Sequence, residues 1–322
     1  MPVFSMRKTS HFSSEQPAVR MLTIEPEFEG QRVDNFLIRV CKGVPKSHIY
    51  KAIRSGQVRV NKGRVQADHR LVSGDVLRVP PLRLPNPGER RKVPPQVFPV
   101  VYEDEAMVVI DKPAGTAVHG GSGVSFGVIE QMRAARPEAR LLELAHRLDR
   151  DTSGLLIIAK QRKALLALHD MMRESAGRKF YQALVEGDFV NDRQHIRKPL
   201  LKWLTAEGER RVRVDAEGKA AHTIVTKLQR FGRYTLLQAE LRTGRTHQIR
   251  VHLASSGHAI VGDDKYGSEI VREHFSRLGF RRMFLHASRL EIPHPLSGEP
   301  LVFEAPLPAA CKEILHYLEQ DK

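Results

Sequence analysis

A proline-rich, charged stretch at residues 81–99, PLRLPNPGERRKVPPQVFP, places the strongest constraint on how this chain can fold. Proline fixes φ and has no backbone N–H, so a run of this composition supports neither a helix interior nor a central strand. The stretch therefore predicts a linker. It leaves a small unit at residues 21–80 and a larger unit at residues 100–322, which gives room for two hydrophobic cores.

The remaining composition indicates an ordinary intracellular protein. Residues 1–20 predict a flexible tail, although their Arg and Ser content leaves a transit peptide open as an alternative. No apolar run approaches the roughly 20 residues that a membrane-spanning helix needs. Cys41 and Cys311 lie far apart and indicate neither a disulfide framework nor a cysteine zinc site. We therefore expect a cytoplasmic protein with no membrane partner.

Positive charge is concentrated near the N-terminus. The chain has 52 Lys+Arg against 37 Asp+Glu, a net charge of +15. Residues 1–100 hold 18 basic and 8 acidic side chains, and the rest of the chain holds 34 and 29, so the excess is +10 in the first part and +5 in the second. Such a balance indicates a polyanionic partner, most simply nucleic acid, that binds to the first unit.

The small unit reads as two short helices followed by a β-turn. RVDNFLIRV (32–40) has helical spacing of its apolar residues. SHIYKAIRSG (47–56) predicts a second helix, with Ser47 as its N-cap and Gly56 as its stop. QVRVN and DVLRVP read as short strands joined through the turn residues NKG and SGD.

This order of elements resembles the S-four-type RNA-binding module, on the residues RVDNFL, PKSHIYKAIRSGQVRVNKGRV and GDVLRVP. The alternative is a basic helical cap that does not bind RNA. The resemblance implies that the exposed basic side chains contact RNA. The candidates are Lys46, Lys51, Arg54, Arg59 and Lys62.

The larger unit predicts an α+β fold. VVYEDEAMVVIDKP reads as two strands joined by a turn, and LLIIAK and KFYQALVEG as further strands. Helices are expected around residues 126–136 and 163–174, and strand-like segments continue to about residue 254. We expect a mixed, mainly antiparallel sheet flanked by helices. Residues 268–282 carry no motif to which a role can be assigned.

The segment HRLDRDTSG (146–154) is the first candidate for chemistry, because it contains two aspartates between two arginines. A nearby guanidinium keeps a partly buried carboxylate ionised, as a nucleophile or base must be. Arg147 and Arg150 are local candidates for this partner, and Arg245 and Arg250 are distant ones. On these residues alone a solvated turn with weak surface ion pairs is favoured. They also leave the choice between Asp149 and Asp151 open.

Several motifs in one order change this interpretation. VVIDKPAGTAVHGGSG, HRLDRDTSG, KFYQALVEG and GRTHQIRVHL together resemble the RluA family of RNA pseudouridine synthases, and the resemblance runs from about residue 24 to 308. GTAVHGGSG and RPEARLLELAHRLDRDTSG are most similar to its large-subunit ribosomal RNA synthase C group. That group also has an S-four-type module ahead of the catalytic domain.

The resemblance implies a role for individual residues. Asp149 would be the catalytic nucleophile or base, and Asp151 would belong to the turn. Four more side chains would complete the site: Arg245 as the counter-ion of Asp149, Tyr181 against the target base, Arg147 holding the RNA, and Ile249 lining the pocket.

The reaction implied is isomerisation of specific uridines to pseudouridine in large-subunit (23S) ribosomal RNA. The base must leave the stack before its atoms can be reached, and Tyr181 and Ile249 would supply the flat and apolar walls that offset this cost. The reaction is neither redox nor hydrolytic, so we expect no cofactor and no metal. We also expect a monomer.

Other functions remain as alternatives. The chain could be a non-catalytic RNA-binding ribosome-assembly factor, or a glycoside or nucleoside hydrolase with Asp149 and Asp151 as paired carboxylates. His247 and His252 would be the candidates for a metal pair, and Ser153, His146 and Asp149 for a hydrolase triad. No G-x-S-x-G motif surrounds Ser153, which argues against the triad. HGGSG (119–123) lacks the lysine and spacing of a phosphate-binding loop, and GKAAHT (218–223) predicts a hairpin loop without chemistry.

Overall fold

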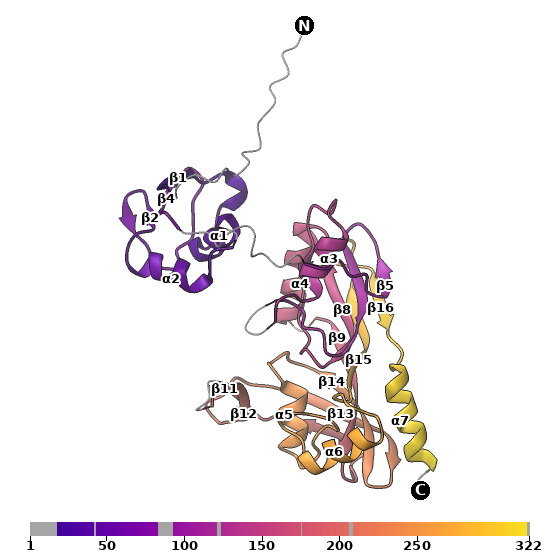
Figure 1. Cartoon of the computed structure of the whole chain (residues 1–322). Helices are drawn as coiled ribbons and strands as arrows, with labels where there is room; N and C mark the ends of the chain where they lie inside the picture. The colour runs from indigo at the N-terminus through magenta and orange to yellow at the C-terminus, as the bar shows by residue number, and fades with distance from the viewer. Residues whose placement is uncertain are drawn as a thin grey trace. The chain divides into compact units, whose positions relative to one another are not determined.

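The computed structural model describes residues 18–320 except 42, 83–92, 121–123, 175 and 206–208. The chain divides into two compact units, which lie within residues 1–92 and 93–322 (Figure 1). Residues 1–17 of the predicted tail and much of the predicted linker fall outside the described residues, as do the last three residues of HGGSG, whereas Arg20, predicted to end the tail, begins strand β1. The predicted domain bounds therefore stay predictions, and each unit is described by itself.

The small unit packs two helices against a sheet of four short antiparallel strands in the order β1-β4-β2-β3. The helical spacing predicted for both helices is confirmed, because Phe36, Leu37, Ile49 and Ile53 share one buried core. The elements are β1 (Arg20–Thr23), the 3-10 helix η1 (Pro26–Phe28), α1 (Val33–Val40), α2 (Lys46–Arg54), β2 (Arg59–Val60), β3 (Gly63–Arg64) and β4 (Val76–Val79).

Helix α2 begins earlier than predicted. Its N-cap is Pro45, with φ −54° and ψ 136°, so Ser47 lies within the first turn and is not the cap. The fixed φ of proline is compatible with a helix start, and Pro45 has no side chain that could cap the helix. At the other end Gly56 has φ 71°, as a left-handed helix stop requires.

The β2–β3 connection is a tight hairpin. Asn61 and Lys62 both have positive φ, 47° and 69°, which matches the type I′ turn that two-residue hairpins prefer. The side chain of Asn61 fixes this turn, because its Nδ2 donates to Oδ1 of Asp75 at 2.7 Å and its Oδ1 accepts from the N–H of Val76 at 2.9 Å. The ammonium-bearing side chain of Lys62 is thereby left exposed at the hairpin tip.

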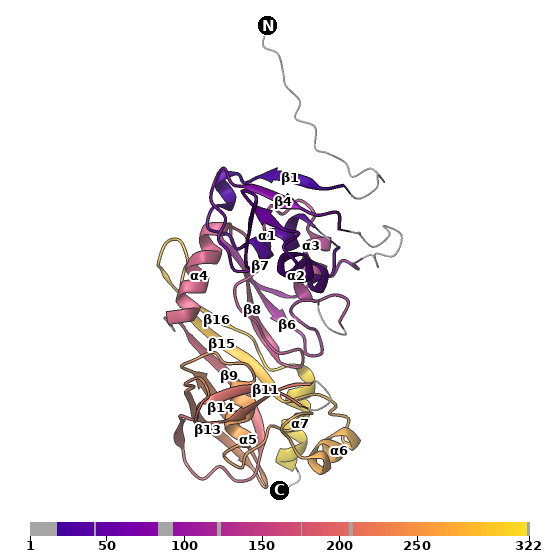
Figure 2. The same ribbon diagram turned by 90° about the vertical axis from the view of Figure 1, so that its left-hand side faces the viewer.

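The larger unit is built on a sheet whose order is β10-β13-β14-β9-β15-β8-β6-β5, with β16 beside β15 and β7 beside β8 (Figure 2). Every pairing is antiparallel except that of β15 with β8, so the predicted mixed, mainly antiparallel sheet is confirmed. The strands are β5 (Val100–Glu103), β6 (Met107–Lys112), β7 (Glu143–Leu144), β8 (Ser153–Ala159), β9 (Arg178–Glu186), β10 (Arg193–Ile196), β13 (Thr223–Phe231), β14 (Tyr234–Leu241), β15 (Leu285–Pro293) and β16 (Pro300–Glu304). A separate two-stranded ribbon pairs β11 (Leu200–Leu204) with β12 (Arg210–Val214).

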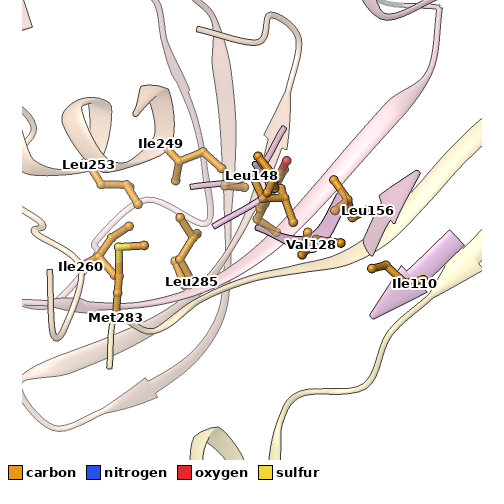
Figure 3. Packing of buried hydrophobic residues seen from close by; sticks show 14 of the residues in the cluster. Ile110, Val128, Leu148, Leu156, Ile249, Leu253, Ile260, Met283 and Leu285 are labelled. Carbon is orange, nitrogen blue, oxygen red and sulfur yellow. The ribbon is translucent and has the colours of Figure 1, made fainter. Parts of the chain in front are cut away.

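Helices cover both faces of this sheet. Ile129 and Leu253 pack in one buried cluster with Leu156 and Leu285, and Figure 3 shows Leu253 and Ile249 lying over Leu285. Other helices fill two further clusters, so alternate residues of β8 are buried on opposite faces. That burial explains why LLIIA is apolar at every position. The helices are α3 (Val128–Ala135), α4 (Arg162–Glu174), α5 (Gln248–Ala254), α6 (Glu269–Arg277) and α7 (Ala309–Gln320).

The prediction of strand-like structure up to about residue 254 is wrong, because residues Gln248–Ala254 form helix α5. Ile249, Val251 and Leu253 alternate with polar residues and so imitate the period of a strand. In the structure the polar Gln248, Arg250 and His252 are buried as well. A helix that is buried on all sides loses its 3.6-residue signature, and periodicity cannot identify it.

Residues 268–282, which carried no motif, contain helix α6. Ser268 is its N-cap and accepts a hydrogen bond from the N–H of Val271, and Val271 and Phe275 are buried. Among the described residues, no helix is both long enough and apolar enough to cross a membrane.

Candidate active site

The HRLDRDTSG turn, between β7 and β8, is fixed by buried contacts. The ammonium group of Lys112 is fully buried and donates to three backbone oxygens, those of Pro113, Thr116 and Arg150, at 2.9, 2.8 and 3.0 Å. Gly154 has φ 107°, and a Cβ there would lie 2.3 Å from the backbone oxygen of Ala287. Glycine meets both demands, so the turn and the strand that follows it have a defined position.

The two aspartates of this turn lie in different surroundings. Asp149 lines a cavity of about 280 Å³, and its side chain is 23% exposed. Asp151 is not among the described residues that line this cavity, and its carboxylate faces the exposed Arg150 at 3.4 Å. A surface pair of that kind contributes little to stability. Position in the fold therefore distinguishes two carboxylates that the charge pattern left equivalent.

The guanidinium beside Asp149 belongs to Arg250 and not to Arg245. Nη1 of Arg250 lies 3.4 Å from Oδ2 of Asp149. Arg245 lines the same cavity, but its Nε donates to the backbone oxygen of Ala220 at 3.1 Å, and no ion pair joins it to Asp149 in the described part of the chain. The predicted Arg245–Asp149 pair is therefore wrong. Helix α5 starts between the two arginines and directs Arg250, from its first turn, toward the aspartate.

Arg250 is held in turn by two more carboxylates. Its Nε and Nη2 donate to the two oxygens of Asp263 at 2.7 and 2.6 Å, and Nη2 also reaches Asp264 at 3.0 Å. Burial alone would lower the pKa of Arg250, but the bonds to Asp263 and the charge of Asp149 outweigh burial and raise that pKa. Burial raises the pKa of Asp263, but the hydrogen bonds from Arg250 lower it by more, so that the pKa of Asp263 is lowered overall. The site therefore keeps a permanent positive charge next to Asp149.

A buried glutamine shapes the start of α5. Oε1 of Gln248 accepts from the Oγ1 of Thr243 at 2.8 Å and from the N–H of Arg245 at 3.0 Å, and its Nε2 donates to the backbone oxygen of His222 at 3.0 Å. These bonds close the GRTHQ turn, in which His247 has φ 52°. The turn then leads directly into the helix that carries Ile249 and Arg250.

Aromatic and apolar side chains form the cavity walls. Tyr181 on β9 is 7% exposed and lines the cavity, and burial together with the Asp149 carboxylate raises its pKa. Ile249, 4% exposed, and Leu285 line it as well. A phenol ring with aliphatic neighbours can hold a flat ring by stacking and apolar contact.

The predicted basic contacts are accessible. Arg147 is exposed at the cavity, and none of the described residues forms a hydrogen bond or ion pair with its guanidinium. In the small unit the predicted RNA contacts are all exposed, namely Lys46, Lys51, Arg54, Arg59 and Lys62. Of these, Arg59 uses its Nε to hold the backbone oxygen of Gly56 at 3.2 Å.

The alternative sites are not assembled. The hydroxyl of Ser153 lies 2.9 Å from Nδ1 of His286, and Nη2 of Arg282 donates to it at 2.7 Å, whereas Nε2 of His146 accepts from a backbone N–H of β8. The side chain of His252 is occupied by Thr223 and the backbone oxygen of Lys198. No group of three possible metal ligands occurs among the residues described.

Sequence analysis missed three side chains. Two of them, Asp263 and Tyr266, belong to the segment GDDKYG. The third is Lys179, which lies two residues before Tyr181 and lines the cavity. Burial lowers the pKa of Lys179. Period-two spacing on a strand places Lys179 and Tyr181 on one face, and this signal could have identified the lysine.

These features place a carboxylate beside a buried guanidinium in a cavity with aromatic and aliphatic walls, and comparison with known proteins identifies the class of the protein. Residues 106–255 match the model of the RNA pseudouridylate synthase family, and residues 31–77 match the S4 domain. The chain is 48% identical over 311 residues, 95% of each chain, to the ribosomal large subunit pseudouridine synthase C of Pasteurella multocida. It therefore belongs to the RNA pseudouridylate synthase family and is an isomerase.

Two further relatives agree with this family assignment. The protein of the same description from Escherichia coli K12 is 46% identical over 313 residues, which cover 95% of this chain and 98% of the relative. A solved structure of human RNA pseudouridylate synthase domain containing 4 covers 69% of this chain and 93% of its own length, with a TM-score of 0.58 and 24% identity. This last likeness supports the fold, and both predictions, the synthase domain and the S4 module, are confirmed.

Proposed function

We propose that this protein converts specific uridines of large-subunit ribosomal RNA to pseudouridine, with Asp149 as nucleophile or base. The observation that carries the proposal is the cavity at Asp149, where one carboxylate, one buried guanidinium and one buried tyrosine meet. The substrate RNA is inferred from the relatives, each of which is named a ribosomal large subunit pseudouridine synthase C.

The reaction needs a site that holds a base out of the helix. The bond between ribose C1′ and uracil N1 breaks, the ring turns, and a bond forms between C1′ and C5, while the hydrogen of C5 leaves to solvent and N1 gains one. Tyr181 and Ile249 give the detached ring flat and apolar walls, which retain it while it rotates. Base–aromatic contact of this kind contributes about 1–3 kcal/mol.

The charges in the cavity suit this chemistry. The Arg250 guanidinium lies 3.4 Å from the Asp149 carboxylate, and a carboxylate in its anionic form can attack a carbon or accept a proton. Arg147 and Arg245 are exposed at the cavity and are positioned to contact the RNA backbone. Phosphate contacts from such arginines orient the RNA without reading its sequence.

The S4 unit supplies further affinity. Its exposed basic side chains neutralise phosphates, so binding through them is salt-sensitive. The enzyme acts as a cytoplasmic monomer in this proposal, which light scattering during gel filtration checks: a dimer mass would contradict the monomer.

The proposal is tested with ribosomal RNA that carries tritium at carbon five of uracil. The wild-type protein releases tritium to water, and Asp149→Asn loses activity about 10²–10⁴-fold or more. Asp151→Asn is the matched control, because it changes the neighbouring carboxylate of the same turn and should retain most activity. Equal activity of Asp149→Asn and wild type would refute the assignment.

A second experiment distinguishes the enzyme from a non-catalytic RNA-binding factor. RNA from a strain lacking the gene is treated with carbodiimide and mapped by primer extension. Wild-type protein restores pseudouridine stops and Asp149→Asn does not. If wild type restores none while it still binds the RNA, the non-catalytic alternative holds.

A further inference from the structure

The second oxygen of the Asp149 carboxylate faces a histidine. Oδ2 is beside Nη1 of Arg250 at 3.4 Å, and Oδ1 lies 3.9 Å from Nε2 of His247. The imidazole is only 14% exposed. Two different nitrogen groups therefore face the two oxygens of one carboxylate, one from within helix α5 and one from the turn before it.

The backbone at His247 is unusual. Its φ of 52° and ψ of 21° are left-handed, a conformation that is uncommon for a residue with a β-carbon and costs about 1 kcal/mol or more. The bonds to the side chain of Gln248 hold the turn in this form. The left-handed turn directs the imidazole between Asp149 and Tyr266, whose ring it meets edge-on at 5.7 Å between centroids.

The neighbour on the other side fixes where the imidazole carries its proton. The Oη of Tyr266 accepts from the N–H of Val212 at 3.0 Å and lies 2.8 Å from Nδ1 of His247. Within the described residues, Nδ1 is the acceptor in reach of the phenolic proton. When the Tyr266 hydroxyl accepts from Val212 and donates to Nδ1, a neutral imidazole carries its hydrogen on Nε2. That is the nitrogen that faces Asp149.

Burial favours the neutral form of this imidazole. Burial lowers the pKa of His247, the Asp149 carboxylate opposes that shift, and the Arg250 guanidinium reinforces it. Lys265 lowers the same pKa and Asp263 raises it, so the groups that face the ring are of both signs. Burial also raises the pKa of Tyr266, which retains its phenolic proton for the bond to Nδ1.

We propose that His247 is a positioning residue for Asp149: a neutral imidazole, protonated on Nε2 by virtue of its bond from Tyr266, donates to Oδ1 and orients the carboxylate. The inference rests on the proposed function, since it assigns a helper to the carboxylate that reacts. A closing movement of about 1 Å brings Nε2 within hydrogen-bond distance of Oδ1. The carboxylate then has a donor on each oxygen and a single orientation toward the ring in the cavity.

The same contacts connect the carboxylate to the β11–β12 ribbon. Val212 lies on β12, and its N–H points away from β11 to reach Tyr266. The ribbon carries the exposed Leu204 and the Trp203–Arg213 pair, whose guanidinium lies 5.8 Å from the indole centroid. A shift of the ribbon therefore changes the bond that fixes the tautomer of His247, and through it the orientation of Asp149.

The tautomer is measured first, without any activity assay. Nitrogen NMR on full-length protein with isotope-labelled histidine should give a neutral His247 protonated on Nε2, assigned through loss of its signals in His247→Gln. Tyr266→Phe removes the donor to Nδ1 and should shift His247 toward a mixture of tautomers. A wild-type His247 protonated on Nδ1 would overturn the proposal whether or not the protein makes pseudouridine.

Turnover by two conservative variants is measured next. Glutamine can place an N–H where Nε2 lies, whereas asparagine reaches only the Nδ1 position but tolerates the left-handed backbone. We expect His247→Asn to lower kcat about 10- to 100-fold, the effect of a lost hydrogen bond to a charged group, with little change in KM. His247→Gln should recover most of kcat.

Equal kcat for His247→Asn and wild type would overturn the inference, and so would equal losses for the two variants, because a purely structural role does not depend on where the N–H lies. Thermal unfolding of both variants shows that they are folded. If wild type itself releases no tritium from uridine, the proposed function fails while the tautomer result still stands.

Discussion

Replacing Asp263 should destabilise the catalytic unit far more than replacing its neighbour Asp264. The side chain of Asp263 is fully buried and accepts four N–H groups: Nε and Nη2 of Arg250 at 2.7 and 2.6 Å, and the backbone N–H of Lys265 and Tyr266 at 2.9 and 3.1 Å. In Asp263→Asn an amide NH₂ replaces one oxygen and meets a guanidinium N–H, so one bond is lost and the buried charge of Arg250 loses its main partner.

Breaking a buried pair by removing one partner costs about 3–5 kcal/mol. Because Arg250 keeps Asp149 and Asp264 as neighbours, we expect about 3 kcal/mol for Asp263→Asn. Asp264→Asn is the matched control: that side chain is 50% exposed and makes one contact with Arg250 at 3.0 Å. Its loss should cost less than about 1 kcal/mol. The expected difference between the two variants is therefore about 2 kcal/mol.

Urea unfolding at neutral pH measures this difference. Trp203 is the only tryptophan of the chain and lies on β11, so its fluorescence reports on the catalytic unit. Tritium release should also fall in Asp263→Asn, because the same guanidinium faces Asp149. A difference below about 1 kcal/mol between the two variants, with equal activities, would refute the argument that Asp263 holds Arg250 in place.

Three further predictions follow from the geometry. The pKa of Asp263 is lower in the folded chain than in the unfolded chain. Its contribution to stability is therefore present above about pH 4 and is lost as pH falls through the folded pKa. The free energy of unfolding should fall less steeply with decreasing pH in Asp263→Asn than in wild type, and an unchanged slope would contradict this. In urea unfolding, Gly154→Ala should lower the free energy of unfolding by clearly more than Gly279→Ala. Both positions have positive φ, 107° and 86°, but a Cβ at Gly279 meets no atom within 4 Å. Gly279→Ala should therefore cost only the backbone strain of about 1 kcal/mol. Lys51→Gln should weaken RNA binding and reduce the slope of log K against log salt by about 1, whereas Lys312→Gln, exposed on α7, should leave the slope unchanged in a filter-binding titration.

The order of motifs predicted the class of the protein because each motif is local. The S4 pattern and the HRLDRDTSG turn depend on residues within a few positions of each other, and both units were recognised from them. Helices α3 and α4 were also predicted within two residues of their observed bounds, since their apolar stripes face only one side. Local spacing carries this information directly.

The counter-ion could not be predicted in the same way. Arg250 and Asp149 are 101 residues apart and meet only because α5 packs against the sheet beside the turn. The alternation of Ile249, Val251 and Leu253 imitated a strand, and a strand gives no reason to prefer Arg250 over Arg245. Asp263, fully buried, is invisible in sequence because aspartate is usually exposed.

The distance along the chain between the residues of the site determines when the site can form during synthesis. The last strand of the S4 unit ends at Val79, so this unit has its whole core once the first quarter of the chain has been synthesised. Asp149 gains its guanidinium only when residues 250 and 263 have also emerged and packed. Since domains fold as units from the N-terminus during synthesis, the nascent chain acquires its basic RNA-binding unit well before it acquires a working active site.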